Sequence, residues 1–220
     1  VLSHFKFTNG KNDEISFDLS QNMIVDSVIY KKSKINFTTN NDLLTIALPV
    51  PVGYGKIDSL TIFYQGEPPS NGFGSFETGT HNNSPILWTL SEPYGSRDWW
   101  PNKMSLLDKI DSIDVFITTP ESYKAASNGL LIDTKTSNSN KTYHWIHRYP
   151  IASYLVAIAV TDYTTYSNYV PMQDGTQLEV LNYVYPESLD DAQNNTPNII
   201  PIIQLFNQLT IPYPFAKEKY

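Results

Sequence analysis

Short runs of β-branched and aromatic residues dominate the chain up to Val160, and turn-forming residues separate them. Runs of this kind are typical of strands, and no helical period interrupts them. The predicted strands cover Glu14–Leu19, Met23–Tyr30, Leu43–Leu48, Ser59–Tyr64, Ser112–Thr118, Thr142–His147 and Tyr154–Val160. We therefore predict a mainly β chain, built as an antiparallel β-sandwich or saddle of sheets.

The first seven residues already alternate between two faces, with Ser3, Phe5 and Phe7 on one and Leu2, His4 and Lys6 on the other. This alternation predicts that the chain starts inside a strand. No initiator Met and no signal-like segment precedes it. We expect a fragment of a longer protein that lacks its first strands.

Three dipeptides predict tight turns, because Asn and Gly both tolerate positive φ. They are Asn9-Gly10, Asn71-Gly72 and Asn128-Gly129.

The alternation stops near Ser188, and a helical spacing replaces it. Apolar residues recur at Ile199, Ile203, Phe206 and Leu209, after a capping threonine and a proline at residues 196 and 197. Pro201 would interrupt the first turns of a helix that starts at this point. The alternative is that the helix starts nearer Pro201. We predict a β domain over residues 1–189 and the beginning of a second domain over residues 190–220.

Length and charge limit the alternatives. At 220 residues the chain can bury the core of one β domain or two small ones without a metal or disulfide. Its net charge is -7, and its 15 lysines and arginines are mostly dispersed along the chain. Nucleic acid binding needs clustered cations, so we expect no nucleic acid partner and no anionic membrane surface. The most apolar stretch, Ile151–Val160, is about half of a bilayer span, so no membrane span is expected.

The chain has no cysteine, which excludes disulfides and thiolate metal sites. That absence fits several compartments. The location stays open, with a secreted or periplasmic protein favoured over a cytoplasmic one.

The segment Leu87–Lys103 carries most of the candidate chemistry. It reads LWTLSEPYGSRDWWPNK and holds three of the four tryptophans. Pro93 and Gly95 break any strand that begins near its start. The polar side chains expected to project from the resulting turn are Glu92, Arg97 and Asp98, and the tryptophans expected to anchor it are Trp88, Trp99 and Trp100.

Two functions of other classes fit the same residues. A noncatalytic binding module for peptide or carbohydrate could stack sugars on exposed faces of Trp99 and Trp100. A glycosidase could use Glu92 and Asp98, which would require both carboxyls to face an open groove about 5 to 9.5 Å apart.

The segment resembles a stretch of the aminopeptidase N family of zinc aminopeptidases. In that family a Glu or Gln stands a few residues before an Arg, an aromatic pair and a Pro, which here are Glu92, Arg97, Trp99, Trp100 and Pro101. Further blocks match in order along the chain. They are Asp18, Leu19, Val25, Asp26 and Val28; Asp42, Leu43, Ile46, Leu60, Ile62, Tyr64 and Gly66; Gly72-Phe73; Ser127-Asn128-Gly129; Pro150, Ser153, Tyr154, Leu155 and Val156; and Tyr213, Pro214 and Lys217.

The resemblance implies a fold and a function. It implies that residues 1–189 are the N-terminal β saddle and that residues 190–220 begin an α-helical, thermolysin-like catalytic domain. Glu92 would bind the free amine of a peptide substrate, and Arg97, Trp99, Trp100 and Pro101 would support it. The parent protein would then be a zinc metalloaminopeptidase that removes N-terminal residues, with the missing catalytic domain as the partner of this chain.

The catalytic parts of such an enzyme are not in the sequence. None of the four histidines is followed by Glu, so the zinc motif H-E-x-x-H is absent. His144 and His147 are a close pair, but in a strand side chains three residues apart face opposite sides. By the resemblance, the zinc ligands and a G-x-M-E-N segment are expected beyond Tyr220. We expect no metal and no catalytic residue in this chain, and no activity from it alone.

The sequence departs from the family pattern directly after Pro101. Where the family often has Cys, Asp and Pro, this chain has Asn102, Met104 and Leu106. We therefore expect a loop of different shape beyond Pro101.

Overall fold

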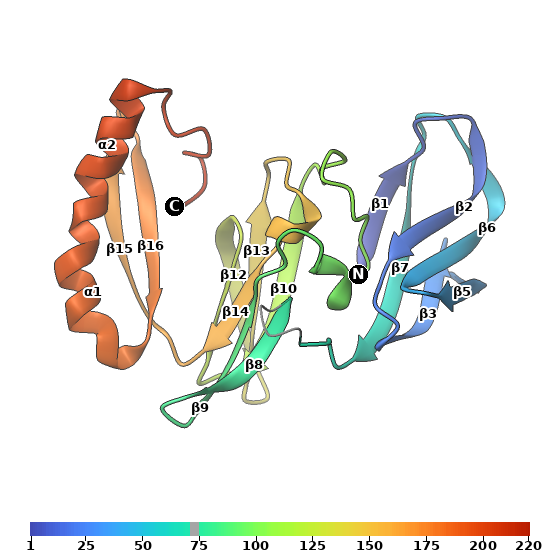
Figure 1. Ribbon diagram of the computed structural model, residues 1–220, viewed down its shortest axis with the longest axis horizontal. Coiled ribbons are helices and arrows are strands. Elements are labelled where there is room, and N and C mark those ends of the chain that lie inside the picture. The colour runs from blue at the N-terminus through green and yellow to red at the C-terminus, as the bar shows by residue number, and fades with distance from the viewer. Residues whose placement is uncertain (71–74) are drawn as a thin grey trace. The chain divides into compact units, whose positions relative to one another are not determined.

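The computed structural model describes residues 1–70 and 75–220. Within them the named strand pairs are all antiparallel, and the helices gather near the C-terminus (Figure 1). The prediction of a mainly β chain followed by a helix is confirmed. The predicted turn at Asn71-Gly72 and the Gly72-Phe73 match lie outside the described residues.

The chain divides into two compact units. The first comprises Val1–Glu77, Thr89–Lys109 and Ala152–Ala157, and the second comprises Thr78–Trp88, Ile110–Ile151 and Ile158–Tyr220. The predicted domain boundary near residue 190 stays a prediction. It falls just after the start of helix α1 (Leu189–Asn195).

The first unit is a sandwich of two sheets around one core. One sheet has the order β1-β7-β3-β4 and the other β2-β6-β5. Their strands are β1 (Leu2–Lys6), β2 (Lys11–Asp18), β3 (Met23–Tyr30), β4 (Ser33–Ile35), β5 (Phe37–Asn40), β6 (Leu43–Gly53) and β7 (Ile57–Gly66). Inward positions alternate with outward ones, so Val28 and Ile62 from one sheet meet Leu44 and Ile46 from the other in one buried cluster.

The second unit holds the remaining sheets, ordered β10-β13-β12, β11-β14-β9-β8 and β15-β16, apart from the first two residues of β8 and the last residue of β9. Their strands are β8 (Phe76–His81), β9 (Ser84–Thr89), β10 (Ile113–Pro120), β11 (Lys124–Ser127), β12 (Leu130–Ser137), β13 (Asn140–His147), β14 (Ile158–Thr161), β15 (Thr164–Pro171) and β16 (Gln177–Val184). Trp145 is fully buried, and its indole N–H donates to Ala125 O at 3.1 Å. A fully buried tryptophan with a satisfied N–H is well suited to centre a core.

Helix α2 (Ile199–Leu209) confirms the predicted helical spacing, and a single 3₁₀ turn, Thr196–Asn198, leads into it. Pro201 lies in the first turn of the helix, where its missing N–H costs no hydrogen bond. Ile203 packs on Val170, Leu178 and Val180 of the β15–β16 ribbon. No helix of the described part is long and apolar enough to cross a bilayer.

The last residues of the chain run beside β16. Lys219 forms a parallel bridge with Glu179, and the Tyr220 amide donates to Glu179 O at 2.8 Å. The ammonium of Lys219 donates to Ser127 O at 2.8 Å and lies 4.6 Å from the ring centroid of Trp145. Burial lowers the pKa of Lys219 to about 8. The segment is therefore anchored to the unit by both its backbone and a side chain.

One predicted strand is wrong over its first half. In the run Tyr154–Val160 the strand β14 begins only at Ile158, and Ser153–Leu155 form a 3₁₀ turn. Leu155 N–H donates to Ala152 O at 3.0 Å there. The buried residues here, Ser153 and Val156, are three positions apart, as in a 3₁₀ turn, rather than two apart, as on one face of a strand. Tyr154 and Leu155 match a strand of the family that the sequence resembles, and that expectation is wrong here as well, because both lie in this turn.

Four hairpins turn through dipeptides other than Asn-Gly, and the sequence analysis did not predict them. The pairs with positive φ are Lys31-Lys32, Asn41-Asp42, Asn82-Asn83 and Asn138-Ser139. Two adjacent positive φ values define the type I′ turn, whose twist matches that of the strands it joins. Of the predicted turn glycines, Gly10 has φ +50 and Gly129 has φ +76.

Gly129 provides a test of this packing. A Cβ at Gly129 would overlap the carbonyl oxygen of Ile146, whereas one at Gly10 would meet nothing within 4 Å. Gly129→Ala should lower the free energy of unfolding by about 3 kcal/mol or more, combining positive-φ strain with the clash. Gly10→Ala carries only the strain, about 1 to 2 kcal/mol. Urea denaturation of both variants measures the difference, and equal losses would contradict the packing at Gly129.

Candidate functional site

Glu92 lies on the exposed part of a tight turn in the first unit. Gly95 N–H donates to Ser91 O at 2.9 Å and closes the turn, and the Glu92–Pro93 peptide bond is cis. Glu92 itself is exposed, while Ser91 is 3% exposed and Ser96 is fully buried. The carboxylate therefore projects from a turn whose two ends are buried in the protein.

The first end of the turn is fixed through Ser91. Its hydroxyl accepts the indole N–H of Trp99 at 2.9 Å and donates to Ser75 O at 3.2 Å. The Ser75 hydroxyl in turn donates to the carboxylate of Asp98, which is buried. Three short polar side chains and one tryptophan thus satisfy one another, as most buried polar groups do.

The second end is fixed through Ser96 and Asn102. Ser96 opens a 3₁₀ turn, Ser96–Asp98, and its hydroxyl donates to Asn102 Oδ1 at 3.0 Å. The amide group of Asn102 donates to Trp100 O at 2.7 Å. Asn102 is 3% exposed, so both of its polar atoms are used inside the protein.

The backbone of this loop is bonded to the sandwich of the first unit. Asp18 and Asn102 exchange two main-chain hydrogen bonds, of 2.7 and 3.1 Å, and the Asp18 carboxylate accepts Met104 N–H at 2.9 Å. Tyr64 of β7 donates its hydroxyl to Trp99 O at 2.9 Å. We call Ser75, Ser91, Ser96, Asp98 and Asn102 the polar base of the Glu92 turn.

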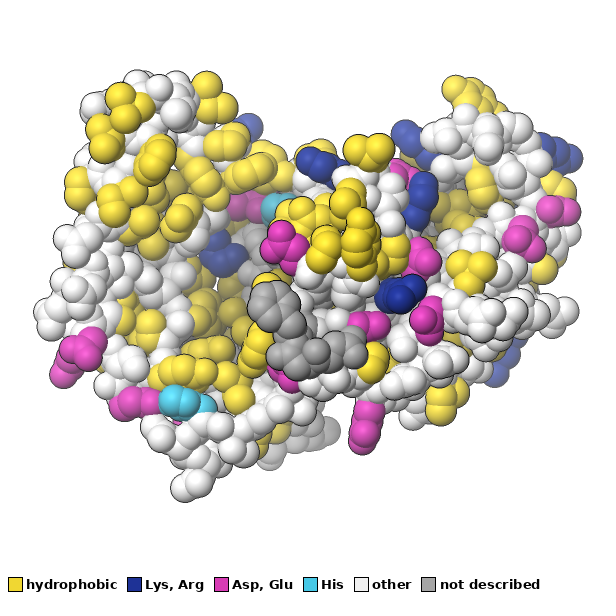
Figure 2. Space-filling model, in the orientation of Figure 1, with side chains coloured by type: hydrophobic (Ala, Val, Ile, Leu, Met, Phe, Trp, Pro, Cys, Tyr) yellow, Lys and Arg dark blue, Asp and Glu magenta, His cyan; other side chains and the backbone are white. Residues whose placement is uncertain are grey.

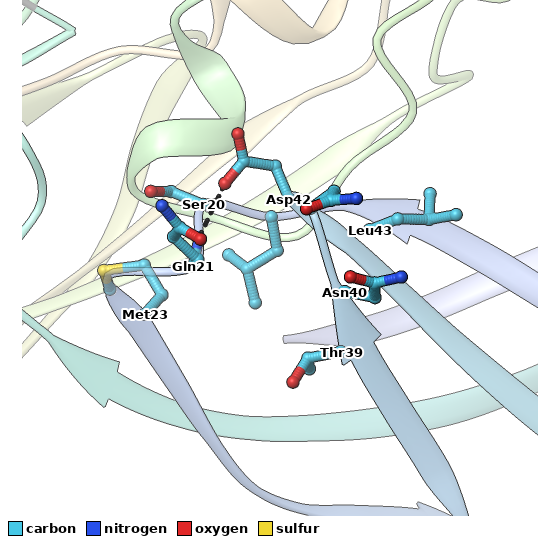
Figure 3. Close-up of a pocket in the computed structure, with 9 residues that line it drawn as sticks. Ser20, Gln21, Met23, Thr39, Asn40, Asp42 and Leu43 are labelled. Atoms are coloured by element: carbon cyan, nitrogen blue, oxygen red, sulfur yellow. Dashed lines mark hydrogen bonds between the residues drawn. The ribbon is translucent and has the colours of Figure 1, made fainter.

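Arg97 points to the turn between β5 and β6. Its guanidinium lies 3.8 Å from Asp42 Oδ2, and its carbonyl accepts Ser20 N–H at 2.8 Å. Asp42 also accepts Gln21 N–H at 2.8 Å, the bond drawn in Figure 3. With both charges partly exposed, this pair contributes about 1 kcal/mol at most. These contacts favour a supporting role for Arg97.

A small polar pocket of about 190 Å³ lies beside Asp42 (Figure 3). The turn after β2 and the hairpin tip between β5 and β6 line it, with Ser20, Gln21, Asn40 and Asp42 among the lining residues. Arg97 pairs with one wall of this pocket.

The other predicted supporting residues lie within or beside the polar base. Pro101 is fully buried, and Trp99 and Trp100 are half-buried with ring centroids 5.9 Å apart. Trp99 also contacts Phe76, at 6.2 Å. Trp88 lies on β9, which ends at Thr89, as expected from the strand-breaking residues that follow.

The arrangement disfavours both alternative functions. A glycosidase needs two carboxyls facing a groove, but Asp98 is buried and accepts from Ser75. A sugar platform needs exposed ring faces, but Trp99 and Trp100 are half-buried, and Trp99 uses its N–H inside the protein.

The close pair of histidines, His144 and His147, contact other side chains. His144 stacks on Phe116 at 4.0 Å, and His147 contacts the buried Glu218 at 2.5 Å. No group of three or more His, Asp or Glu within residues 1–70 and 75–220 is placed to bind a metal ion.

Sequence reasoning located the turn but missed most of its base. Ser75, Ser91, Ser96 and Tyr64 were assigned no role there, and Asn102 was seen only as a departure from a pattern. One signal was available: serines directly flank a turn that contains proline and glycine, and small hydroxyl side chains often bond to nearby backbone.

Comparison with known proteins identifies the fold. No protein-family model and no curated protein matches the chain. Solved structures do match. The M1 zinc metallopeptidase from Deinococcus radiodurans has a TM-score of 0.76 at 21% identity, over 94% of this chain and 47% of that one. A point mutant of it bound to a Tyr-Ser-Ala substrate gives 0.75 at 20%, over 94% and 48%.

A more distant match gives the same result. Legionella pneumophila aminopeptidase A, in complex with aspartic acid, has a TM-score of 0.73 at 17% identity, over 90% of this chain and 23% of that one. The chain therefore shares its fold with part of the M1 zinc metallopeptidases. It spans about half the length, or less, of these structures.

Burial of the Tyr64 hydroxyl, which bonds to the loop, predicts a pH-dependent loss of stability. Burial raises the pKa of Tyr64 to about 12, so the folded protein keeps the proton where the unfolded chain ionises near pH 10. This contribution is complete below pH 10 and is lost as pH rises toward 12. Tyr64→Phe should weaken that pH dependence, and at pH 7 it should lower the free energy of unfolding by about 1 to 3 kcal/mol.

Urea midpoints between pH 7 and 12 measure both effects. Tyr94→Phe, at an exposed site in the same loop, is the matched control and should change neither. Because burial also raises the pKa of Tyr183 to about 12, part of the pH dependence persists in every variant. A Tyr64→Phe protein that is indistinguishable from the control would contradict the assigned bond.

Proposed function

We propose that this chain is part of a zinc-dependent aminopeptidase and that it supplies the carboxylate that binds the free α-amine of a peptide substrate. The observation that carries this proposal is the placement of Glu92. Its side chain is exposed, but the residues on both sides of its turn are buried and bonded to the polar base. The shared fold with M1 zinc metallopeptidases supports it.

The geometry suits recognition of a cation. A protonated α-amine offers three N–H donors, and a carboxylate accepts them in charge-assisted bonds worth about 1.5 to 3 kcal/mol each. A carboxylate that is already held in position loses less entropy on binding than a freely moving one. A rigid turn with an exposed acid meets that requirement.

Selectivity for chain ends follows from the same chemistry. An acetylated or internal peptide nitrogen carries no charge, so such a substrate would bury Glu92 without a partner. The penalty falls on the wrong substrate, while the correct one is bound through its charge. The carboxylate would therefore distinguish a free N-terminus from every other peptide nitrogen.

The remaining parts of the enzyme would lie outside this chain. The described residues offer no ligand set for zinc, so the metal would be held by a domain that residues 190–220 begin. Zinc, when bound there, would polarise the scissile carbonyl or activate water. This chain would contribute binding and orientation of the amine.

Kinetics of Glu92 variants in the longer protein test the proposal, once the gene beyond Tyr220 is shown to encode G-x-M-E-N and H-E-x-x-H. Glu92→Gln should raise KM about tenfold with kcat nearly unchanged, because it keeps an acceptor but removes the charge. Glu92→Ala should lower kcat/KM about 100-fold or more. Hydrolysis of unblocked aminoacyl substrates is the assay.

Glu67→Ala, an exposed acid in the same unit, is the control and should leave both constants unchanged. Wild-type kinetics in the Glu92→Ala enzyme would refute the assigned role. A gene that continues without a zinc motif would refute the enzymatic assignment itself.

A further inference from the structure

Two turns meet at one end of the sandwich in the first unit (Figure 1). They join β1 to β2 and β6 to β7, and Gly55 N–H of the second turn donates to Phe7 O of the first at 2.9 Å. A Cβ at Gly10 or at Gly55, one in each turn, would meet nothing within 4 Å. The part of the chain that the structure describes therefore leaves the tips of both turns uncovered.

Lysines that are dispersed along the sequence gather at this end. Lys6 lies opposite Ile57, where β7 begins, and Lys11 lies opposite Gly53, where β6 ends. The β3–β4 turn adjoins them, because the tyrosine that ends β3 donates its hydroxyl to Asp58 of β7 at 2.6 Å. We call the lysines of these strands and turns the basic end, and all of them are exposed: Lys6, Lys11, Lys31, Lys32, Lys34 and Lys56.

Most of these charges have no acidic partner. Within residues 1–70 and 75–220, the one ion pair of the basic end joins Lys31 to Asp58 at 3.5 Å. The other acids near it are Asp13 and Glu14 of β2, so this end is positive although the chain has a net charge of -7. The acids at the opposite end of the same strands are Asp18, Asp42 and Glu67.

Two apolar side chains project from the basic end. Tyr54 is 71% exposed and Ile57 is 75% exposed, close to Lys56 in the same turn. Figure 2 shows hydrophobic side chains at this end, with Lys or Arg side chains on both sides of them. A tyrosine presents an apolar ring and a polar tip, which suits the boundary between lipid headgroups and acyl chains.

The kind of cation indicates the kind of partner. Arg97 and Arg148, the arginines of the chain, lie elsewhere and pair with Asp42 and Asp114. Arginine is favoured where a planar, bidentate contact selects one phosphate or carboxylate, whereas lysine acts as a point charge on a flexible stem. Lysines around two apolar side chains therefore suit a fluid anionic surface better than a shaped acidic protein face.

We propose that the basic end, together with Tyr54 and Ile57, binds the surface of an anionic lipid bilayer. The lysines attract the negative headgroups, and the two apolar side chains enter the boundary beneath them. The expectation of no anionic membrane partner rested on the dispersal of lysines along the sequence, and the fold brings them together.

Binding at this end leaves the candidate site free. The Glu92 turn is bonded to the opposite end of the sandwich, where Asp18 exchanges main-chain hydrogen bonds with Asn102 and Arg97 O accepts Ser20 N–H. The proposal does not depend on the proposed function, because the lysines and Tyr54 have no part in binding the amine.

Sedimentation with vesicles tests the proposal. The 220-residue chain is mixed with phosphatidylcholine vesicles that either contain or lack phosphatidylglycerol. We expect binding only where phosphatidylglycerol is present, and about tenfold weaker binding or less in high salt, because salt screens exposed charges. Lys11→Gln/Lys56→Gln should lower the partition coefficient about tenfold or more. Tyr54→Ser should lower it about tenfold without changing the dependence on salt.

Lys103→Gln/Lys109→Gln is the matched control. Both lysines are exposed and belong to the same unit, and the change in net charge is identical. This variant should bind vesicles as the wild-type chain does. Each variant must retain the wild-type circular dichroism spectrum, and Lys6→Gln/Lys32→Gln repeats the test if Lys11→Gln/Lys56→Gln does not.

Several results would overturn the proposal. They are no binding to phosphatidylglycerol vesicles, equal binding to phosphatidylcholine alone, and equal losses in the control and in Lys11→Gln/Lys56→Gln. Binding of polyglutamate without binding of vesicles would assign the basic end to an acidic polypeptide instead. Salt-sensitive dimers, seen by analytical ultracentrifugation and lost in Lys11→Gln/Lys56→Gln, would assign it to the acidic end of a second copy if vesicles are not bound.

Discussion

The pairing of buried polar groups governs the candidate site. A hydroxyl, amide or carboxylate removed from water costs about 1 to 3 kcal/mol, or more when charged, unless a partner replaces the water. In the polar base, Ser91 bonds to Trp99 and to Ser75, Ser75 bonds to Asp98, and Ser96 bonds to Asn102. The bonds form two groups, one through Ser91 and Ser75 and one through Ser96 and Asn102, and each group holds one end of the turn.

For function, this means that the backbone of the loop is held in place while the carboxylate of Glu92 is exposed. The polar base and the bond from Tyr64 to Trp99 fix the backbone on both sides of Glu92, while Glu92 itself remains open to solvent. Binding sites are often loops placed by a rigid scaffold. Here the scaffold is the two-sheet sandwich of the first unit, and its contribution is to hold the turn.

The sequence allowed the regular parts of the fold to be predicted, and the physical reason is periodicity. The run Met23–Tyr30 was predicted with the bounds that β3 has, because one face of that strand is buried and the other is not. The same reasoning failed at Tyr154, where a 3₁₀ turn replaces the strand and the buried residues Ser153 and Val156 are three positions apart rather than two. Hairpins through Lys31-Lys32 and Asn138-Ser139 were missed, because their positive φ values are imposed by strand twist rather than by glycine.

The candidate site was likewise predicted in part and missed in part. Glu92 and the turn were found from local breakers and aromatic residues, which are visible in one segment of sequence. Ser75, Tyr64 and Asp18 reach the loop from 16 to 86 residues away in the chain, and no local pattern encodes such contacts. Helix α2 was also predicted only in part. The spacing predicted the helix, but not that Phe206 and Leu209 would stay exposed.

The most direct test of this account is amide hydrogen exchange of residues 91–102 in the 220-residue chain. If the polar base holds the turn, the amides of Gly95, Asp98 and Asn102 should exchange about 1,000-fold or more slowly than in an unfolded peptide, while the unbonded tip exchanges fast. Exchange of all three within about tenfold of the unfolded rate would show that the loop is not held, and the rigid presentation of Glu92 would be wrong.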